Sequence, residues 1–582
     1  MELMYLPTIE SPADLRKIPV DELPILAKEI RHVISEQVKE SGGHLAPNLG
    51  VVELTIALHY VFDFSHDRLL FDVGHQCYTH KLLTGRFPML SKLRQRGGMS
   101  GFPNPDESPF DLFAVGHAGT SISTSVGMAR GDTLSGEAFD PESNQQGRRV
   151  VALVGDGSIV NGVAMEGLNN AGTLKRQFLV VLNDNGMSIA KPQGAISAYF
   201  DHIRVGTTYR SLKQTAKNVM EKLPGGSILG DLSHRMTEMM KDAISADSWF
   251  EHFGLLSVGP IDGHDLPSLI SALIEVKDVD HPLLLHVHTT KGKGFAYAEE
   301  DATAFHSPKP FEVVMDKVKV RKGGRSFTVA FADAMTDLMS RDDRIVVATA
   351  AMPDGTGVDK LLEKFPKRVW DAGICESHTF DMLAGMAKTG LKPFFAVYST
   401  FLQRAFDQAF QEGALQGLPV RLCLDRAGVV GGDGPVHHGF CDIALLRVFP
   451  NAAIMAAIDE PTLHAALTFM SGYESGLSAV RYPRDSVLHQ DGSCEEFVLG
   501  KAHQIRKVYN PELAILGYGV PTMHALEVAQ RFEGSYAIDV YDARFAKPVD
   551  GDLLEHLLAN DIPIITVEDH SFTGGFGAAL LE

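Results

Sequence analysis

The chain has 582 residues, of which 45% are hydrophobic and 22% charged, so it is long enough to bury several cores. Its net charge of −20 argues against a nucleic acid partner, because a phosphate backbone is bound by a basic surface. Its five cysteines are odd in number and scattered, which favours a reducing compartment, and no apolar run approaches the length of a membrane span. We therefore expect a cytoplasmic protein without a signal peptide and without a membrane partner.

The first predicted elements end in glycine and histidine. Residues 21–39 have the apolar spacing of an amphipathic helix, which ends at Gly43 and His44. After a second helix over 51–62, the predicted strand 69–73 ends at Gly74 and His75. A third glycine–histidine pair, Gly116-His117, precedes a helix of small residues. Each histidine alone also fits an ordinary surface or core role.

A strand, a crossover helix and a second strand follow. Residues 150–154 and 178–182 are short apolar runs typical of parallel strands buried on both faces, and 162–174 has helical spacing. The strands stop at Gly155-Asp156-Gly157 and Asn183-Asp184-Asn185, so Asp156 and Asn185 should meet at one sheet edge. A carboxylate and an amide oxygen there suit Mg²⁺, which completes its shell with phosphate and water. Either motif alone is also typical of a tight turn or a polar loop.

The remaining chain predicts further α/β structure. Residues 189–247 have poor periodicity and predict a long, partly mobile excursion, after which strands return at 255–258 and 283–287. Residues 295–325, which include His306, are interpreted as a linker. Later strands are predicted at 345–349, 394–397, 420–424, 453–456, 478–481, 513–516, 536–541 and 562–567. The pattern predicts an α/β protein of three doubly wound domains, over 1–325, 326–494 and 495–582.

From His44 to Gly577 the chain resembles the 1-deoxy-D-xylulose 5-phosphate synthase family of transketolase-like enzymes. The matching motifs are Ser41-Gly42-Gly43-His44, Asp72-Val73-Gly74-His75-Gln76, Gly155-Asp156-Gly157, Asn183-Asp184-Asn185, Tyr398-Ser399-Thr400-Phe401-Leu402-Gln403-Arg404, Asp425-Arg426-Ala427-Gly428 and Arg481-Tyr482-Pro483-Arg484. The resemblance implies a homodimer that holds thiamine diphosphate and Mg²⁺ between its first and second domains. It implies condensation of pyruvate with glyceraldehyde 3-phosphate, with loss of CO2, for isoprenoid, thiamine and pyridoxal biosynthesis.

The resemblance also implies site residues. Glu376 matches the glutamate that activates the cofactor's aminopyrimidine, although an acid at a helix N-terminus also explains it. The other implied catalytic residues are His44, His75, His306, His437 and Asp433. The cofactor-binding residues are His75, Gly116, His117, Ala118, Gly155, Asp156, Gly157, Asn185, Lys291, Glu376, Phe401 and Arg404, and the metal ligands are Asp156, Asn185 and Met187. The contacts to the substrate phosphate are Tyr398, Arg426 and Arg481, since guanidinium groups bind phosphate well.

Several positions depart from the family's usual pattern. Ser377 stands where the family usually has glutamine, Ala118 and Gly119 stand where it has two serines, and Gly186 stands where it has an acid. The C-terminal domain is expected to be shortened. Two alternatives therefore stay open at this point. One is a related thiamine diphosphate enzyme with another donor or acceptor, of the transketolase or oxo-acid decarboxylase type, and the other is a non-catalytic protein that keeps the cofactor fold.

Overall fold

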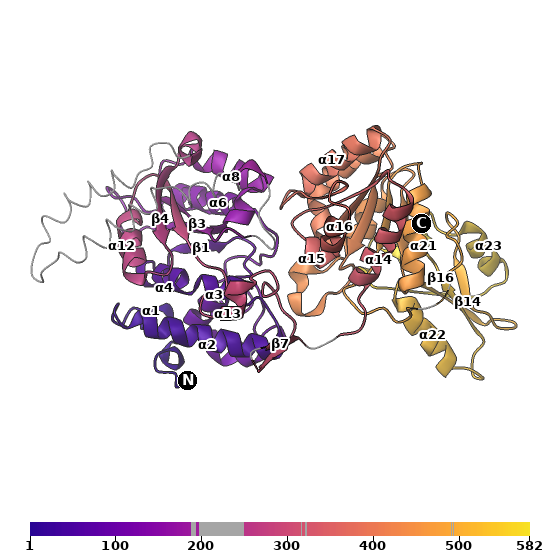
Figure 1. The fold of residues 1–582 in the computed structure, drawn as a ribbon, viewed down its shortest axis with the longest axis horizontal. Helices are drawn as coiled ribbons and strands as arrows, with labels where there is room; N and C mark the ends of the chain where they lie inside the picture. Colours follow the sequence, from indigo (N-terminus) through magenta and orange to yellow (C-terminus); the bar gives the residue numbers. More distant parts are fainter. Residues whose placement is uncertain (188–193, 197–248, 316, 321–322, 491, 493) are drawn as a thin grey trace, which may run out of the picture. The chain divides into compact units, whose positions relative to one another are not determined.

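The computed structural model describes residues 1–187, 194–196, 249–315, 317–320, 323–490, 492 and 494–582. These form two compact units, Met1–Arg321 and Lys322–Glu582, each with its own sheets (Figure 1). The excursion expected over 189–247 lies outside the described residues, apart from 194–196. None of the described helices is long and apolar enough to cross a membrane.

The first unit is built on a parallel five-stranded sheet in the order β1-β2-β3-β5-β4. Its strands are β1 (Arg68–Phe71), β2 (Val150–Gly155), β3 (Phe178–Asp184), β4 (Leu256–Asp262) and β5 (Pro282–His288). Its helices are α1 (Pro12–Leu15), α2 (Leu23–Ser41), α3 (Ala46–Gly50), α4 (Val52–Val61), α5 (Tyr78–Lys81), α6 (Ser121–Leu134), α7 (Asp156–Ile159), α8 (Gly162–Ala171), α12 (Leu266–Val276) and α13 (Ala296–Glu300).

Helices cover both faces of this sheet, which makes it doubly wound. Alternate strand residues such as Val151 and Leu153 pack with α2, α4 and α12, whereas Ala152 and Val154 pack with α6 and α8. Figure 1 shows the two helical layers on opposite sides of the strands. The carboxyl ends of β2 and β3 are therefore held between two cores.

The predicted linker over 295–325 is wrong in part, because much of this segment folds with the first unit. It contains α13 and the hairpin of β6 (Phe311–Val314) and β7 (Lys317–Val320). Phe295, Phe305 and Phe311 form an aromatic cluster within that unit's core, with centroid separations of 5.5 to 6.2 Å. Packing of these three rings against the core fixes the segment that carries His306.

The second unit contains a seven-stranded sheet in the order β17-β12-β13-β11-β10-β8-β9 and a four-stranded sheet in the order β14-β16-β15-β18. The strands are β8 (Ile345–Thr349), β9 (Val369–Asp371), β10 (Lys392–Tyr398), β11 (Arg421–Asp425), β12 (Ala453–Ala456), β13 (Ser478–Arg481), β14 (His503–Arg506), β15 (Leu513–Tyr518), β16 (Ile538–Asp542), β17 (Phe545–Lys547) and β18 (Ile564–Glu568). The helices are α14 (Phe327–Arg341), α15 (Pro353–Thr356), α16 (Val358–Lys364), α17 (Glu376–Lys388), α18 (Ser399–Leu402), α19 (Phe406–Gln408), α20 (Asp442–Arg447), α21 (Glu460–Gly472), α22 (Pro521–Arg531), α23 (Gly551–Ala559) and α24 (Phe576–Leu581).

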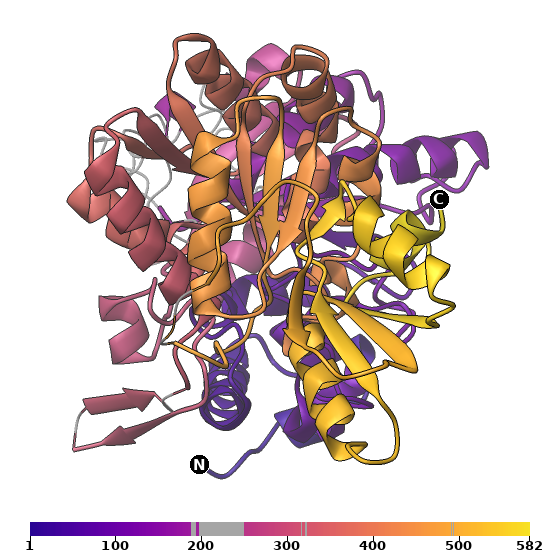
Figure 2. The ribbon, with the colours of Figure 1, turned by 90° about the vertical axis from the view of Figure 1, so that its right-hand side faces the viewer.

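The two sheets of the second unit are joined through one edge strand. β17, from the last third of the unit, pairs antiparallel with β12 of the larger sheet, while the other pairings in that sheet are parallel. Figure 2 shows the gold strands of the smaller sheet beside the orange strands of the larger one. The predicted division of this unit at residue 494 stays a prediction, since the chain on its C-terminal side completes the larger sheet.

Candidate active site

The carboxyl ends of the neighbouring parallel strands β2 and β3 bring Asp156 and Asn185 together. Asp156 begins α7, is only 2% exposed, and its Oδ2 accepts a hydrogen bond from the Gly186 amide at 3.0 Å. Because Gly186 directly follows Asn185, this bond joins the two motifs. Asn185 Oδ1 accepts a hydrogen bond from the Met187 amide at 3.0 Å, so Asn185 and Met187 lie in one turn, which the Gly186 amide joins to Asp156.

Lys291 adds a cation to this sheet edge, which we call the diphosphate edge (Asp156, Asn185 and Lys291). Lys291 is 6% exposed, and its ammonium interacts electrostatically with Asp156. Burial lowers the pKa of Lys291 to about 8, against the opposing effect of Asp156. A Cβ atom built on Gly155 would meet no atom of the described residues within 4 Å, so the backbone there is open to a ligand. Gly157 follows inside α7.

His44, His75 and His306 come from three separate segments and form one cluster in the first unit. The ring centroids lie 5.4 Å apart for His44 and His75, 5.2 Å for His75 and His306, and 5.8 Å for His44 and His306. Burial lowers the pKa of His306 well below its usual value, and the charge of Lys291 adds to this effect. A neutral imidazole can accept a proton, so the cluster is suited to proton transfer.

Two residues that sequence reasoning missed fix this cluster. Asn48 Nδ2 donates to the carbonyl oxygens of His44, at 2.7 Å, and His75, at 2.8 Å. Asn48 Oδ1 accepts from the Tyr78 amide, and the Tyr78 hydroxyl accepts from the His44 amide at 3.1 Å. Asn48 is fully buried, so these bonds hold the two histidine turns together. The only sequence signal for Asn48 is a polar residue in the largely apolar stretch between the two predicted helices.

The loop that contains Gly116, His117 and Ala118 is fixed by Asp72. The Asp72 carboxylate accepts hydrogen bonds from the amides of Gly119, at 2.8 Å, and Ser121, at 3.0 Å. Gly119 has a φ of +89°, and a Cβ atom there would lie 2.3 Å from Asn161 Oδ1. The glycine found in place of the family's serine is therefore required by the neighbouring Asn161 side chain.

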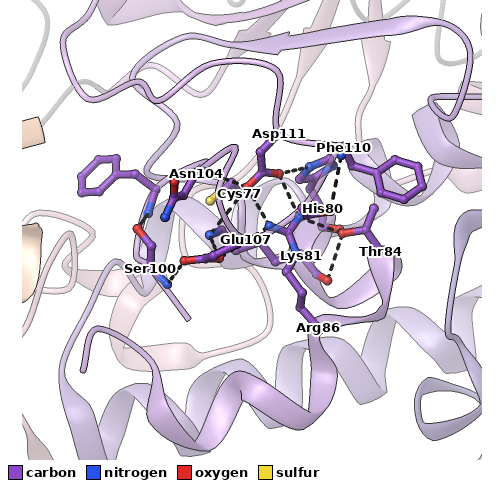
Figure 3. Close-up of polar contacts among 12 residues, drawn as sticks. Cys77, His80, Lys81, Thr84, Arg86, Ser100, Asn104, Glu107, Phe110 and Asp111 are labelled. Carbon is purple, nitrogen blue, oxygen red and sulfur yellow. Dashed lines mark hydrogen bonds and ion pairs between the residues drawn. The ribbon is translucent and has the colours of Figure 1, made fainter. Parts of the chain in front are cut away.

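A buried ion cluster lies beneath the adjoining loop and was also missed (Figure 3). Lys81 Nζ donates to Glu107 Oε2 at 2.6 Å, and the Arg86 guanidinium donates to both oxygens of Asp111 at 2.6 and 2.8 Å. His80 Nε2 lies 2.8 Å from Asp111 Oδ1, and its Nδ1 lies 2.9 Å from His59 Nε2. The cluster fastens residues 100–111 to α5, just after His75.

In the second unit, Glu376 begins α17 and is 3% exposed. Its Oε2 lies 3.6 Å from Arg404 Nη1 and has no hydrogen-bond partner among the described residues. Burial raises the pKa of Glu376, and the charge of Arg404 acts in the opposite direction. Ser377, the departure from the family pattern, donates from Oγ to the Arg404 carbonyl at 2.7 Å and so fixes the same arginine.

Three ring-bearing side chains of the second unit contact one another. The Phe401 ring stacks on the Tyr398 ring at 5.4 Å and 10°, and the His437 ring meets it edge-on at 5.5 Å. Asp433 forms an ion pair with Arg484, and both charges act on the Tyr398 hydroxyl. Sequence reasoning did not select Arg484, because either arginine of the Arg481-Tyr482-Pro483-Arg484 motif fits the pattern.

The Arg426 guanidinium lies over the Tyr398 ring, as expected if both side chains bind one anion. Its guanidinium carbon is 4.2 Å from the Tyr398 ring centroid, and its Nη1 lies 2.8 Å from Asp425 Oδ2. The same nitrogen donates to the Gly355 carbonyl and to Thr328 Oγ1. Burial raises the pKa of Tyr398 to about 12, so the phenol stays a neutral donor beside the guanidinium.

The structure does not bring Arg481 into this group. Its Nε donates to Asp442 Oδ2 at 3.0 Å, and its Nη2 donates to the carbonyls of Gly439, at 3.3 Å, and Asp569, at 3.1 Å. The side chain is 5% exposed and its guanidinium lies 5.9 Å from the Tyr518 ring. These contacts connect β13 of the larger sheet to Asp569, which follows β18 of the smaller sheet, and they occupy the Arg481 guanidinium.

The donors of both units fit thiamine diphosphate and Mg²⁺. The diphosphate edge offers one carboxylate and one amide oxygen for a hard cation, and a buried ammonium for phosphate oxygens. Glu376 offers a buried carboxyl oxygen without a hydrogen-bond partner, which suits a ring nitrogen that carries or shares a proton. Phe401 supplies an aromatic ring of the kind on which a flat heterocycle stacks.

Comparison with known proteins gives matches to three family models, which together cover most of the chain. Residues 6–289 match the family model of 1-deoxy-D-xylulose-5-phosphate synthase, residues 324–489 that of the transketolase pyrimidine binding domain, and residues 500–582 that of the transketolase C-terminal domain. A 1-deoxy-D-xylulose-5-phosphate synthase 1 from Geobacter sulfurreducens is 43% identical, over 99% of this chain and 90% of its own length. A 1-deoxy-D-xylulose-5-phosphate synthase from Carboxydothermus hydrogenoformans is 42% identical, over 99% of this chain and 91% of its own length. Among solved structures, a transketolase from Leishmania mexicana is 18% identical, over 95% of this chain and 91% of its own, with a TM-score of 0.41.

Proposed function

The chain belongs to the 1-deoxy-D-xylulose-5-phosphate synthase family, and from this premise we propose how its residues share the reaction. The protein is a transketolase-type transferase that condenses pyruvate with glyceraldehyde 3-phosphate to 1-deoxy-D-xylulose 5-phosphate and CO2. It uses thiamine diphosphate and contributes to isoprenoid biosynthesis. The residue roles, the metal, a homodimeric state and a cytoplasmic location are proposals.

The diphosphate edge would bind Mg²⁺ and the cofactor's diphosphate. Asp156 and Asn185 supply oxygen ligands, with the Met187 backbone as a third candidate in the same turn. Lys291 supplies a positive charge, and the open backbone at Gly155 permits close approach of phosphate oxygens. Gly116, His117 and Ala118, in the loop that Asp72 fixes, would line the neighbouring part of the cofactor.

The second unit would bind and activate the aminopyrimidine ring. Burial raises the pKa of Glu376, which favours its protonated form, and the carboxyl group would share a proton with the ring nitrogen. Arg404 limits this shift through its charge, and Phe401 offers its face for stacking. The buried Glu376 oxygen without a hydrogen-bond partner is the observation that carries the proposal most directly.

Thiamine diphosphate, when bound, supplies a carbon that adds to the keto group of pyruvate and accepts the electron pair left by CO2. His44, His75 and His306 would exchange protons with the substrate oxygen atoms that gain or lose charge. His437 is placed beside Phe401 for the same task in the second unit, and Asp433 holds Arg484 nearby. The lowered pKa of His306 favours its neutral form.

Tyr398 and Arg426 would bind the phosphate of glyceraldehyde 3-phosphate. A guanidinium and a neutral phenol can each donate to phosphate oxygens, and their stacking presents both on one surface. We propose Arg484 as the third member, because its charge acts on the Tyr398 hydroxyl. Arg481, selected from the motif alone, would instead maintain the contact between the two sheets.

A donor test separates this reaction from that of a true transketolase. With thiamine diphosphate and Mg²⁺ present, the protein should release CO2 from pyruvate when glyceraldehyde 3-phosphate is added. It should not transfer a two-carbon unit from a ketose phosphate at a comparable rate. Two-carbon transfer without CO2 release would contradict the proposed assignment of donor and acceptor.

A further inference from the structure

Lys291 lies in a loop, residues 289–293. Hydrogen bonds attach this loop to other segments of the first unit both before and after Lys291. The Thr290 amide donates to His264 Nε2 at 2.8 Å, and the Lys293 carbonyl accepts from Arg31 Nε at 3.0 Å. The Gly292 amide donates to the Ala46 carbonyl at 2.9 Å. The backbone on either side of Lys291 is therefore fixed.

Two of these bonds come from one buried unit, the Arg31–Glu53–His264 unit. Arg31 Nη1 and Nη2 donate to the two oxygens of the Glu53 carboxylate, and His264 Nδ1 lies 3.1 Å from Glu53 Oε2. The three side chains are 13%, 10% and 14% exposed. The members come from α2, α4 and the turn after β4, so the unit ties three elements to the loop.

The hydrogen bonds fix the tautomer of His264. Glu53 can only accept, so His264 Nδ1 carries the proton, and Nε2 is left to accept from the Thr290 amide. A side chain at this position must therefore donate on one side and accept on the other. An aliphatic residue offers neither bond, whereas a glutamine amide offers both.

The position of this loop determines where the Lys291 ammonium lies. Lys291 interacts with Asp156 of the diphosphate edge and also with His306 of the histidine cluster. Its own side chain is buried, so a shift of its backbone moves the ammonium relative to both groups.

We propose that the Arg31–Glu53–His264 unit is a positioning device that holds the Lys291 ammonium at the diphosphate edge and so raises the affinity for the cofactor's diphosphate. Its members are positioning residues that act through Lys291, and they need not touch the cofactor. The inference rests on the proposed role of Lys291 and extends it to a hydrogen-bonded network behind that residue.

A double-mutant cycle tests the inference. Calorimetry of thiamine diphosphate binding, with Mg²⁺, compares the wild type, His264→Leu, Lys291→Met and the double variant. His264→Leu should weaken binding about tenfold in the wild-type background. In the Lys291→Met background the same change should weaken it less than about twofold, because the residue through which it acts is gone.

Two further variants show whether the hydrogen bonds are responsible. His264→Gln, which keeps a donor and an acceptor, should retain more affinity than His264→Leu. If His264→Leu does not fold, His264→Asn replaces it in the cycle, since the shorter amide reaches only one partner. His59→Leu is the matched control: His59 is a buried histidine on the same helix as Glu53, but its ring contacts His80 of the buried ion cluster.

The outcomes separate this inference from the function on which it rests. His59→Leu should lower the melting temperature and change cofactor affinity by equal factors with and without Lys291. Equal factors for His264→Leu in both backgrounds would overturn the positioning role while leaving Lys291 as a cofactor contact. Unchanged affinity in Lys291→Met would overturn both the role of Lys291 and the inference.

Discussion

Glu376 Oε2 lies 3.6 Å from Arg404 Nη1, and Ser377, the next residue, bonds the Arg404 backbone. The carboxyl group is thus buried with one charge near it, and its Oε2 has no hydrogen-bond partner among the described residues. This relationship explains how a carboxyl group with a raised pKa is kept in place. The serine found instead of the family's glutamine takes part in it, so the departure is compatible with a functioning site.

Glu376→Ala should leave thiamine diphosphate bound and stop activation of the cofactor, because the diphosphate edge is intact while the proton on the ring nitrogen is no longer shared. Exchange of the cofactor's C2 proton, followed by NMR, measures that step. Glu376→Gln, which can donate but not ionise, is the matched variant and should also exchange slowly. Exchange at the wild-type rate in both variants would exclude the proposed role.

Asp156→Ala and Asn185→Ala should lose cofactor binding that depends on Mg²⁺, because they remove the side-chain oxygen ligands of the diphosphate edge. Removal of Mg²⁺ with EDTA should have the same effect on the wild type. Asn170→Ala, an exposed asparagine on α8, should bind normally. Calorimetry with and without Mg²⁺ measures this, and equal affinity under both conditions in the wild type would refute the metal site.

Arg426→Ala and Arg484→Ala should raise KM for glyceraldehyde 3-phosphate much more than KM for pyruvate. Loss of one charge-assisted contact costs on the order of 1.5 to 3 kcal/mol, which is roughly ten- to a hundredfold. With unphosphorylated glyceraldehyde, Arg484→Ala should be little impaired, because this arginine then has no phosphate to bind. Arg426→Ala also leaves the buried Asp425 carboxylate without its partner and should lower stability as well, so Arg484→Ala is the cleaner test.

Arg481→Ala gives the contrasting result in the same assays. Removal of one partner of its buried pair with Asp442 should cost about 3 to 5 kcal/mol of stability and impair both acceptors alike. If Arg481→Ala instead raises KM only for the phosphorylated acceptor, at an unchanged melting temperature, Arg481 would be assigned to the residues that bind the substrate phosphate.

The Glu53 carboxylate should make the first unit sensitive to acid. Burial alone would raise its pKa, but the hydrogen bonds from His264 and Arg31 outweigh burial and lower it from 4.5 to about 2. A lowered pKa stabilises the fold above pH 4.5, by about 3 kcal/mol, and this contribution is lost as the pH falls toward 2. The stability gap between the wild type and Glu53→Gln, from urea unfolding at pH 5 and pH 3, should therefore narrow in acid.

The exposed Glu36 on α2 provides the control for this prediction, because its pair with Lys39 is accessible to solvent. Glu36→Gln should change stability little at either pH. A gap for Glu53→Gln that stays constant between the two pH values would contradict the account of its pKa.

Local patterns predicted the strands well, since a strand buried on both faces is an uninterrupted apolar run. The bounds at 345–349, 453–456 and 478–481 agree with β8, β12 and β13. The pairing of β17 with β12 was not predicted, because a three-residue strand has no periodicity to detect. The segment 295–325 was misread because three widely spaced phenylalanines reveal a core only after the chain folds.

Residues that close a strand could be selected from sequence, as Asp156 and Asn185 were, because their position follows from sheet geometry. Networks between distant segments could not. Asn48, which bonds two histidine turns, and His264, which bonds the Lys291 loop, are single polar residues without a motif-level signal in this sequence. The proposal of Arg484 in place of Arg481 likewise needed the fold, since only the side-chain contacts separate them.

The central claim is that this protein joins two carbons of pyruvate to glyceraldehyde 3-phosphate. The most direct measurement is ¹³C NMR of the product formed from [2,3-¹³C]pyruvate, glyceraldehyde 3-phosphate, thiamine diphosphate and Mg²⁺. The account predicts 1-deoxy-D-xylulose 5-phosphate labelled at its methyl and keto carbons, with one CO2 released for each product molecule. Labelled acetaldehyde or acetate in place of the ketose phosphate, or no consumption of pyruvate, would contradict it.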